Sequence, residues 1–335
     1  MSRRASRGVA IAFALAAVLA APLRAYLGLG VQVGSRVVAL KWPSMPVRYF
    51  ITNRDVPGVT APQLQAAVDR AFSTWGSLPT AQISAQFVGF TGADPVNNDG
   101  ATVLGFQAHP ELDRVLGATT HAVDQTTGAV VESDIFLNST FDWSVAAGGE
   151  AARFDVQSIA THEIGHLLGL SHSALGETEL RPSGGRRVLG KSAVMFPIAF
   201  PAGNIADRTL KPDDIAGMSD VYPTAAFQTS TGSLPGRVTL NGAGLFGAHV
   251  TAFNVSTGTL VGGFALDAQG RFSIDGLASG LYVVRVEPLD DADLDSFFAP
   301  DAVVNIDFKP AVYAKLVAVP ARGAAASIEI RVQAK

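Results

Sequence analysis

The stretch at residues 161–173, "THEIGHLLGLSHS", constrains this chain more than any other part of its sequence. His162 and His166 are four residues apart, so on a helix both rings lie on one face with Cβ atoms about 5–6 Å apart. Gly169 tolerates the left-handed backbone that ends a helix, which lets the chain reverse and bring His172 back. We therefore predict that three imidazole rings meet at one point.

Three imidazoles gathered in this way can share one tetrahedral ion, with each nitrogen about 2.0–2.1 Å from zinc and a fourth position left for water. Glu163, beside the first histidine, can take a proton from that water, because zinc lowers the pKa of the water toward neutrality. This is the H-E-x-x-H arrangement of a zinc protease. The leucines of the stretch then pack the helix into a core that holds the ligands rigid.

Two alternatives remain at this point. The third ligand can be a carboxylate, Glu177 or Glu179, although His172 makes this unnecessary. The protein can also be a catalytically idle, metal-binding adhesion or scaffold protein, although such a protein has no need of the base Glu163. For the histidines that stand alone in the sequence we expect structural roles: His109, His121 and His249.

Size and composition favour two globular units. The chain has 335 residues and is 48% hydrophobic, which is enough for two cores. The net charge is −4, and no run dense in Lys and Arg follows the N-terminus, so we expect no nucleic-acid partner. Cysteine is absent, which excludes disulfides, cysteine nucleophiles and cysteine-based zinc sites.

The N-terminus indicates export. Residues 1–8 carry three arginines and no acid, and residues 9–21 are an unbroken apolar run. This run is shorter than the roughly 20 residues that span a bilayer, so it is typical of a secretory signal peptide, which we place at residues 1–25. We expect a secreted, extracellular or periplasmic protein without stable membrane insertion after signal removal.

The first unit, which we place at residues 30–225, is predicted to be α+β, a mixed twisted sheet with an active-site helix and a C-terminal helix. The active-site helix should begin at the N-cap Asp155 and stop at Gly169, and an earlier helix should begin at the N-cap Thr60. The final helix is signalled by "LKPDDIAGMSDVYP". Apolar and β-branched runs predict the strands, at residues 45–53, 83–90, 102–106 and 128–138.

From about residue 226 the sequence changes character. Residues 226–234 are rich in Ser and Thr, are followed by Pro235 and Gly236, and are predicted to be a linker. Short β runs separated by turns follow at residues 235–335, which predicts an all-β sandwich. The glycine and aliphatic spacing of this region resembles the carboxypeptidase-regulatory-like, prealbumin-type domains. We expect it to be a spacer, a stabiliser or a module that binds a surface or another protein.

The histidine stretch resembles the metzincins, whose signature H-E-x-x-H-x-x-G-x-x-H is matched by His162, Glu163, His166, Gly169 and His172. The segment "SAVMFP" then resembles the methionine turn of this clan, with Met195 beneath the metal. Met-Phe-Pro is similar to the Met-Tyr-Pro of matrixins. The resemblance implies a zinc-dependent endopeptidase that acts on proteins or peptides, with one catalytic zinc ion.

Parts of the matrixin pattern are missing. Latency through a propeptide cysteine is excluded because the chain has no cysteine, and the second, structural zinc site cannot form because only His109 and His121 precede the motif. Calcium sites are common in the family. The aspartates that could hold calcium have no calcium-loop spacing, so we expect them to be solvated turn residues: Asp94, Asp99, Asp124 and Asp134.

Overall fold

The computed structural model describes residues 11–12, 28–33, 36–124, 126–182 and 184–335. The predicted signal peptide, residues 1–25, lies outside these ranges apart from residues 11–12. Among the described residues, no helix combines the length and the apolar character needed to cross a membrane.

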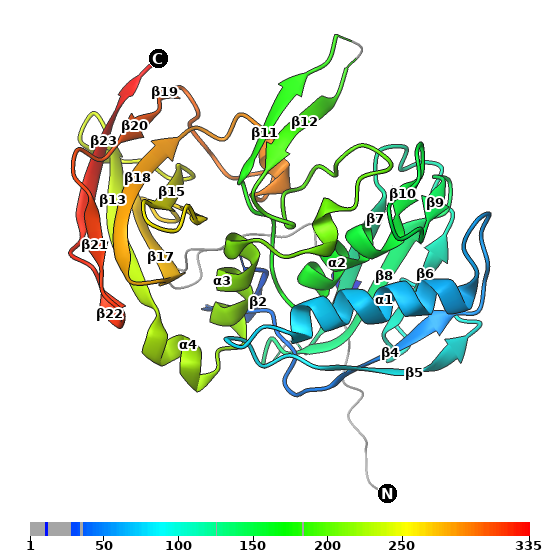
Figure 1. The fold of residues 1–335 in the computed structure, drawn as a ribbon. Coiled ribbons are helices and arrows are strands. Elements are labelled where there is room, and N and C mark those ends of the chain that lie inside the picture. Colours follow the sequence, from blue (N-terminus) through cyan, green and yellow to red (C-terminus); the bar gives the residue numbers. More distant parts are fainter. Residues whose placement is uncertain (1–10, 13–27, 34–35, 125, 183) are drawn as a thin grey trace, which may run out of the picture.

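The first part of the chain is built on a six-stranded mixed sheet (Figure 1). Its strand order is β1-β7-β8-β6-β4-β5. Strands β8, β6, β4 and β5 run parallel to one another, whereas β7 is antiparallel to β8. The short β1 pairs with the outer edge of β7. The bounds are Ile11–Ala12 (β1), Val47–Thr52 (β4), Ala85–Thr91 (β5), Val103–Gln107 (β6), Gly117–Val123 (β7) and Val130–Asn138 (β8).

Two helices pack together beside this sheet, α1 (Ala61–Gly76) and α2 (Val156–Leu167), as Figure 1 shows. The predicted caps are confirmed: the Thr60 side chain accepts the Gln63 N–H as part of a capping box, and the Asp155 side chain accepts the Ser158 N–H. The Trp75 indole N–H donates to a carbonyl of α2 over 2.9 Å. Burial of the apolar faces of both helices against the sheet forms the first core.

Shorter elements complete this part of the chain. The expected final helix is α3 (Pro212–Val221). A two-stranded hairpin between the histidines and α3 was not predicted, because its sequence is polar and glycine-rich. The remaining bounds are Gly30–Val33 (β2), Arg36–Ala39 (β3), Trp143–Ser144 (β9), Phe154–Asp155 (β10), Gly176–Leu180 (β11), Arg186–Lys191 (β12) and Ala206–Arg208 (the 3-10 turn η1).

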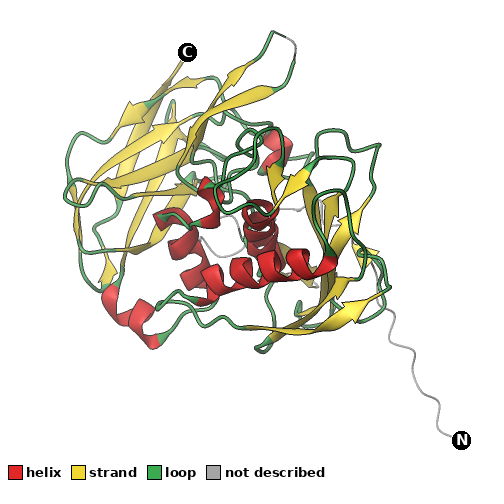
Figure 2. Ribbon diagram, turned by 45° about the vertical axis from the view of Figure 1, so that its right-hand side comes forward, coloured by secondary structure: helices red, strands yellow, loops and turns green. Residues whose placement is uncertain are grey.

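The rest of the chain, from β13 onward (residues 232–335), is rich in β-structure (Figure 2), and we call it the second β-rich region. One sheet has the order β14-β13-β23-β19, with β17 and β22 also paired to β13, and the other has the order β16-β15-β18-β20, with β21 paired to β18. Residues of both sheets share one apolar core. The bounds are Gly232–Leu240 (β13), Ala243–Gly244 (β14), His249–Asn254 (β15), Leu260–Phe264 (β16), Arg271–Leu277 (β17), Gly280–Glu287 (β18), Leu294–Ser296 (the 3-10 turn η2), Phe308–Lys309 (β19), Ala311–Val312 (β20), Val317–Val319 (β21), Gly323–Ala324 (β22) and Ile328–Ala334 (β23).

The segment expected as a linker, residues 226–234, differs from the expectation in its local structure. It holds most of a short helix, α4 (Ala225–Ser230), and the start of β13. Thr224 caps α4 by accepting the Phe227 N–H, and the Phe227 side chain is buried. One N-cap and one buried aromatic side chain are enough to order these six residues, and neither changes the overall composition of the segment. Composition alone therefore does not predict α4.

Candidate metal centre

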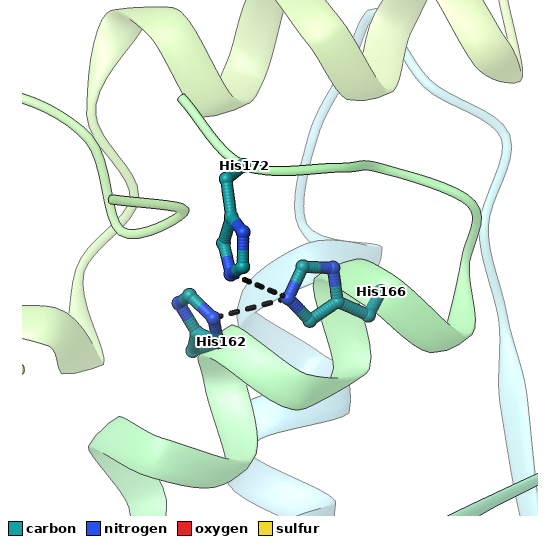
Figure 3. A group of neighbouring side chains, drawn as sticks. All are labelled: His162, His166 and His172. Carbon is teal, nitrogen blue, oxygen red and sulfur yellow. Dashed lines mark hydrogen bonds between the residues drawn. The ribbon is translucent and has the colours of Figure 1, made fainter. Parts of the chain in front are cut away.

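Three histidine rings meet at the end of α2 (Figure 3). Their ligand nitrogens all lie within 4.8 Å of one another. The His166 Nε2 atom lies 3.1 Å from the His162 Nε2 atom and 3.2 Å from the His172 Nε2 atom. His162 and His166 project from successive turns of α2, and His172 approaches from the loop that follows. The trio predicted from the sequence is therefore brought together.

The other nitrogen of each ring fixes the tautomer. The Nδ1–H groups donate to backbone carbonyls, of Val194 for His162 (2.8 Å), of Leu170 for His166 (2.8 Å) and of Ser296 for His172 (2.7 Å). A carbonyl can only accept, so each Nδ1 carries the proton and each neutral ring turns an unprotonated Nε2 toward the other two.

Burial keeps these rings neutral. It lowers the pKa of His162 to about 3 and also lowers the pKa values of His166 and His172. The dashed contacts in Figure 3 consequently join lone pairs, which repel one another unless a cation lies between them. Tetrahedral zinc with nitrogens at about 2.0–2.1 Å separates its ligands by about 3.3–3.4 Å, close to the distances found here. The donor set therefore fits a zinc ion.

Gly169 supplies the reversal between the second and third rings. Its φ of +105° lies outside the range that other residues readily adopt. A Cβ at this position would also overlap the backbone carbonyl oxygen of Leu40. The Leu170 N–H bonds back to the Gly165 carbonyl over 3.0 Å, which closes the end of the helix. Both the conformation and the close approach therefore require glycine.

Met195 lies directly under the helix that carries two of the rings. The side chain is 2% exposed, and a Cβ added at Gly165 would overlap the Met195 sulfur. Gly165, between the two helical histidines, thus lets the methionine approach the backbone of α2. This places Met195 where the expected methionine turn should be.

The buried carboxylate of Asp214 holds that turn in place. Its oxygens accept the backbone N–H groups of Val194 (2.9 Å), Met195 (3.1 Å) and Lys211 (2.8 Å). Burial nevertheless raises the pKa of Asp214 to about 6. The peptide carbonyl of Val194 is the acceptor for His162, so Asp214 acts on the orientation of that ring through one residue.

Glu163 faces the sheet and not the core of the helix pair. The Thr119 hydroxyl on β7 lies 2.8 Å from the Glu163 Oε2 atom and donates to it. Burial raises the pKa of Glu163 to about 7, and the bond from Thr119 opposes this shift. Gly117, on the same strand, leaves room for the glutamate, because a Cβ there would approach Glu163 Oε1 to 3.3 Å.

A cleft with a volume of about 790 Å³ contains Glu163 and the three histidines. Part of its wall is β7 and the residues just before it, and part is the hairpin β11–β12. The segment after Met195 and the turn η2 of the second β-rich region complete the lining. The site is thus open to a molecule of peptide size.

The other candidate residues do not join this cluster. Among the described residues, the histidine trio alone brings three or more potential ligand side chains together. His109 and His249 have carboxylate partners, and His121 is buried without a hydrogen-bond partner in the described part. Asp94, Asp99 and Asp124 lie in loops as expected; Asp99 and Asp124 accept bonds from nearby backbone N–H groups, and Asp94 pairs with Arg54. The expectation of a solvated turn residue is wrong for Asp134, which lies in β8, is 1% exposed and accepts three backbone N–H groups of neighbouring segments.

Several residues around the site were not predicted. Thr119 belongs to β7, whose sequence "GATTHAV" lacks the large apolar residues that mark a strand. The sequence also showed no sign of the contacts of Asp213, whose carboxylate accepts the Ser173 hydroxyl (2.6 Å) and the Gly262 N–H (2.8 Å). The Ser296 contact is made by a backbone carbonyl, which leaves no mark in a sequence.

Comparison with known proteins agrees with this geometry. Residues 41–183 match the family model of the matrixins, a range that contains the three histidines. Metalloendoproteinase 1-MMP of Arabidopsis thaliana is 30% identical over 191 residues, covering 54% of this chain and 44% of its own length. Metalloendoproteinase 5-MMP of the same plant is 27% identical over 214 residues, covering 58% of this chain and 51% of its own length.

Metalloendoproteinase 1 of Glycine max is 30% identical over 171 residues, with 47% of this chain and 45% of its own length covered. The chain thus spans about half the length of the curated relatives that it matches. Over residues 41–183, which carry the three histidines, the sequence of this chain is thus similar to the matrixins.

Proposed function

We propose that this protein is a zinc-dependent endopeptidase in which His162, His166 and His172 hold the ion and Glu163 is the general base. One observation carries the proposal: three unprotonated Nε2 atoms converge in a cleft that also holds a buried glutamate. Bound zinc would supply a Lewis acid that acidifies a water and polarises the peptide carbonyl.

Glu163 is the group that moves protons. It takes a proton from the attacking water and returns it to the departing amine nitrogen, as a general base and then a general acid. The bond from Thr119 fixes the orientation of the carboxylate. Because Glu163 follows His162 directly on α2, the helix that presents the metal ligands also presents the base.

The substrate is proposed to lie as an extended strand along β7. In the described part of the chain, β7 is paired along its length with β8, and its other edge is paired only at His121 and Ala122. The beginning of β7, from Gly117 to Thr119, lines the cleft. A peptide added at this edge would satisfy free backbone groups and bring its scissile bond over the histidines.

The remaining sequence-based assignments are part of this proposal. We infer export by a signal peptide at residues 1–25, a catalytic unit at residues 30–225, and a second unit at residues 235–335 of the prealbumin-like sandwich type. Proteins or peptides are the proposed substrates, and calcium, which only the family resemblance allows, is not part of the proposal. The alternative, an idle metal-binding adhesion or scaffold protein, is separated by the experiment that follows.

Purified zinc-loaded protein is assayed on casein and on a fluorogenic peptide library, with and without a chelator. Glu163→Gln is expected to retain zinc and to lose about 10²–10⁴-fold in rate. The matched control is Glu179→Gln, which changes an exposed glutamate of β11 and one of the two carboxylates considered as an alternative ligand; it should keep both zinc and activity. Full activity of Glu163→Gln refutes its role, and zinc binding without any peptide cleavage favours the scaffold.

A further inference from the structure

A segment of the second β-rich region reaches into the metal centre. Two ligand rings donate to carbonyls of the first part of the chain, whereas His172 donates to the Ser296 carbonyl over 2.7 Å. Ser296 ends the turn η2 and lies 124 positions after His172. The orientation of the third ligand is therefore set by a distant part of the chain. We call residues 289–298 the bridging segment.

Apolar contacts fix the end of the bridging segment. Phe297 and Phe298 are each 2% exposed. They belong to one apolar cluster with Ala174 and Phe196, which lie just after His172 and just after Met195. The segment is thus packed against both chain stretches that surround the histidine trio.

Polar contacts fix its beginning. The Thr178 N–H donates to the Asp291 carboxylate and the Thr178 hydroxyl to the Asp291 carbonyl, both over 2.6 Å. The Arg186 guanidinium donates to the Asp290 carbonyl over 2.8 Å. Thr178 and Arg186 belong to β11 and β12, so the hairpin beside the cleft clamps the bridging segment.

A second tie between the two parts of the chain lies next to the same ligand. The buried carboxylate of Asp213 accepts the Ser173 hydroxyl over 2.6 Å and the Gly262 N–H of β16 over 2.8 Å. Ser173 follows His172 directly. The short stretch that presents the third ligand is therefore held against the second β-rich region from two directions.

We propose that the bridging segment is a positioning element of the metal site, so that the second β-rich region completes the site and is more than a spacer. This rests on the proposed zinc site. An acceptor on Nδ1 fixes both the tautomer and the rotation of a ligand ring, and loss of such partners typically weakens metal binding by about 10–100-fold. Ser296 acts through its carbonyl and is not itself a ligand.

The test uses the full chain with Asp295 deleted. The turn η2 depends on bonds from the Ser296 N–H to the Asp293 carbonyl (2.9 Å) and from the Phe297 N–H to the Leu294 carbonyl (3.0 Å). Removal of one residue should break this pattern and turn the Ser296 carbonyl away from His172. Deletion of the exposed Asp301, in the neighbouring turn, is the matched control. Ser296→Ala, which keeps the carbonyl, is a second control.

The readouts do not depend on hydrolysis. Zinc affinity is measured by chelator competition, and the Nδ1–H signal of His172 is followed by NMR of ¹⁵N-histidine-labelled protein, which has six histidines. The Asp295 deletion should weaken zinc binding by about 10–100-fold and remove the slowly exchanging Nδ1–H signal of His172. Both controls should keep this signal and a zinc affinity within about twofold of wild type.

Wild-type zinc affinity in the folded Asp295 deletion would overturn the proposal. If this variant does not fold, the zinc-loaded wild-type protein provides the test. A His172 ring that shows no protected Nδ1–H signal in that protein equally overturns the proposal. A protein that binds zinc but cleaves no peptide would refute the proposed function and leave this test intact.

Discussion

Gly169→Ala should damage the protein at the point where the chain turns from α2 toward His172. The new residue would have to adopt φ near +105°, which costs about 1–2 kcal/mol for a residue with a Cβ. Its Cβ would also overlap the Leu40 carbonyl oxygen, and overpacking of a well-packed site costs about 1–3 kcal/mol. Together the free energy of unfolding should fall by about 2–5 kcal/mol.

The neighbouring backbone has little freedom to relieve this overlap. The Leu40 N–H donates to the Leu29 carbonyl over 2.7 Å, and the Leu29 N–H donates to the Gly169 carbonyl over 2.9 Å. Any shift of Leu40 away from the new methyl group therefore disturbs a bond that returns to the mutated residue. Accommodation should also displace His172 and weaken zinc binding.

Thermal unfolding of the metal-free protein, followed by circular dichroism, measures the effect. A loss of 2 kcal/mol or more should lower Tm by at least about 4 °C. Gly148→Ala is the control, because a Cβ there would meet nothing within 4 Å. A Gly169→Ala protein with the Tm and zinc affinity of the control would refute the claim that this glycine enforces the reversal.

Two further predictions concern buried carboxylates. Asp214→Asn puts an amide group among three backbone N–H donors, so the free energy of unfolding should fall by about 2–4 kcal/mol and zinc affinity should drop. Denaturation and chelator competition measure both effects, with Asp301→Asn as the control. Equal stability of the two variants would contradict the role of Asp214 under the methionine turn. Burial raises the pKa of Asp134 from 3.8 to about 7, so the folded state keeps a proton that the unfolded state has lost between these pH values. The stability that this group contributes is fully present below pH 3.8 and is lost as the pH rises through 7. In EDTA, between pH 4 and 8, the free energy of unfolding of the wild type should therefore fall by on the order of 3 kcal/mol more than that of Asp134→Asn. Parallel pH profiles of the two proteins would refute this.

Much of the centre of the site could be predicted from the sequence, because its determinants are local. The i, i+4 spacing of His162 and His166, the cap Asp155 and the stop Gly169 all lie within one helix and its ends. Each of these signals acts over a few residues, where backbone geometry alone decides which side chains meet. The histidine trio therefore follows from the sequence without knowledge of the rest of the fold.

The surroundings of the site could not be predicted, because they depend on contacts between distant segments. Strand β7 has weak strand character by itself and is ordered by β8, so Thr119 gave no signal as a partner of Glu163. The hairpin β11–β12 is polar, and its attachment to Asp291 is visible only after folding. A backbone acceptor such as the Ser296 carbonyl is independent of residue type, so no sequence pattern could mark it.

X-ray absorption spectroscopy of the zinc-loaded protein tests the central claim most directly. The account predicts one zinc ion per chain with three imidazole nitrogens at about 2.0–2.1 Å and one further light ligand, and the loss of one imidazole from this shell in His172→Ala. A shell with only two imidazoles in the unaltered protein, or one that is unchanged in His172→Ala, would contradict it.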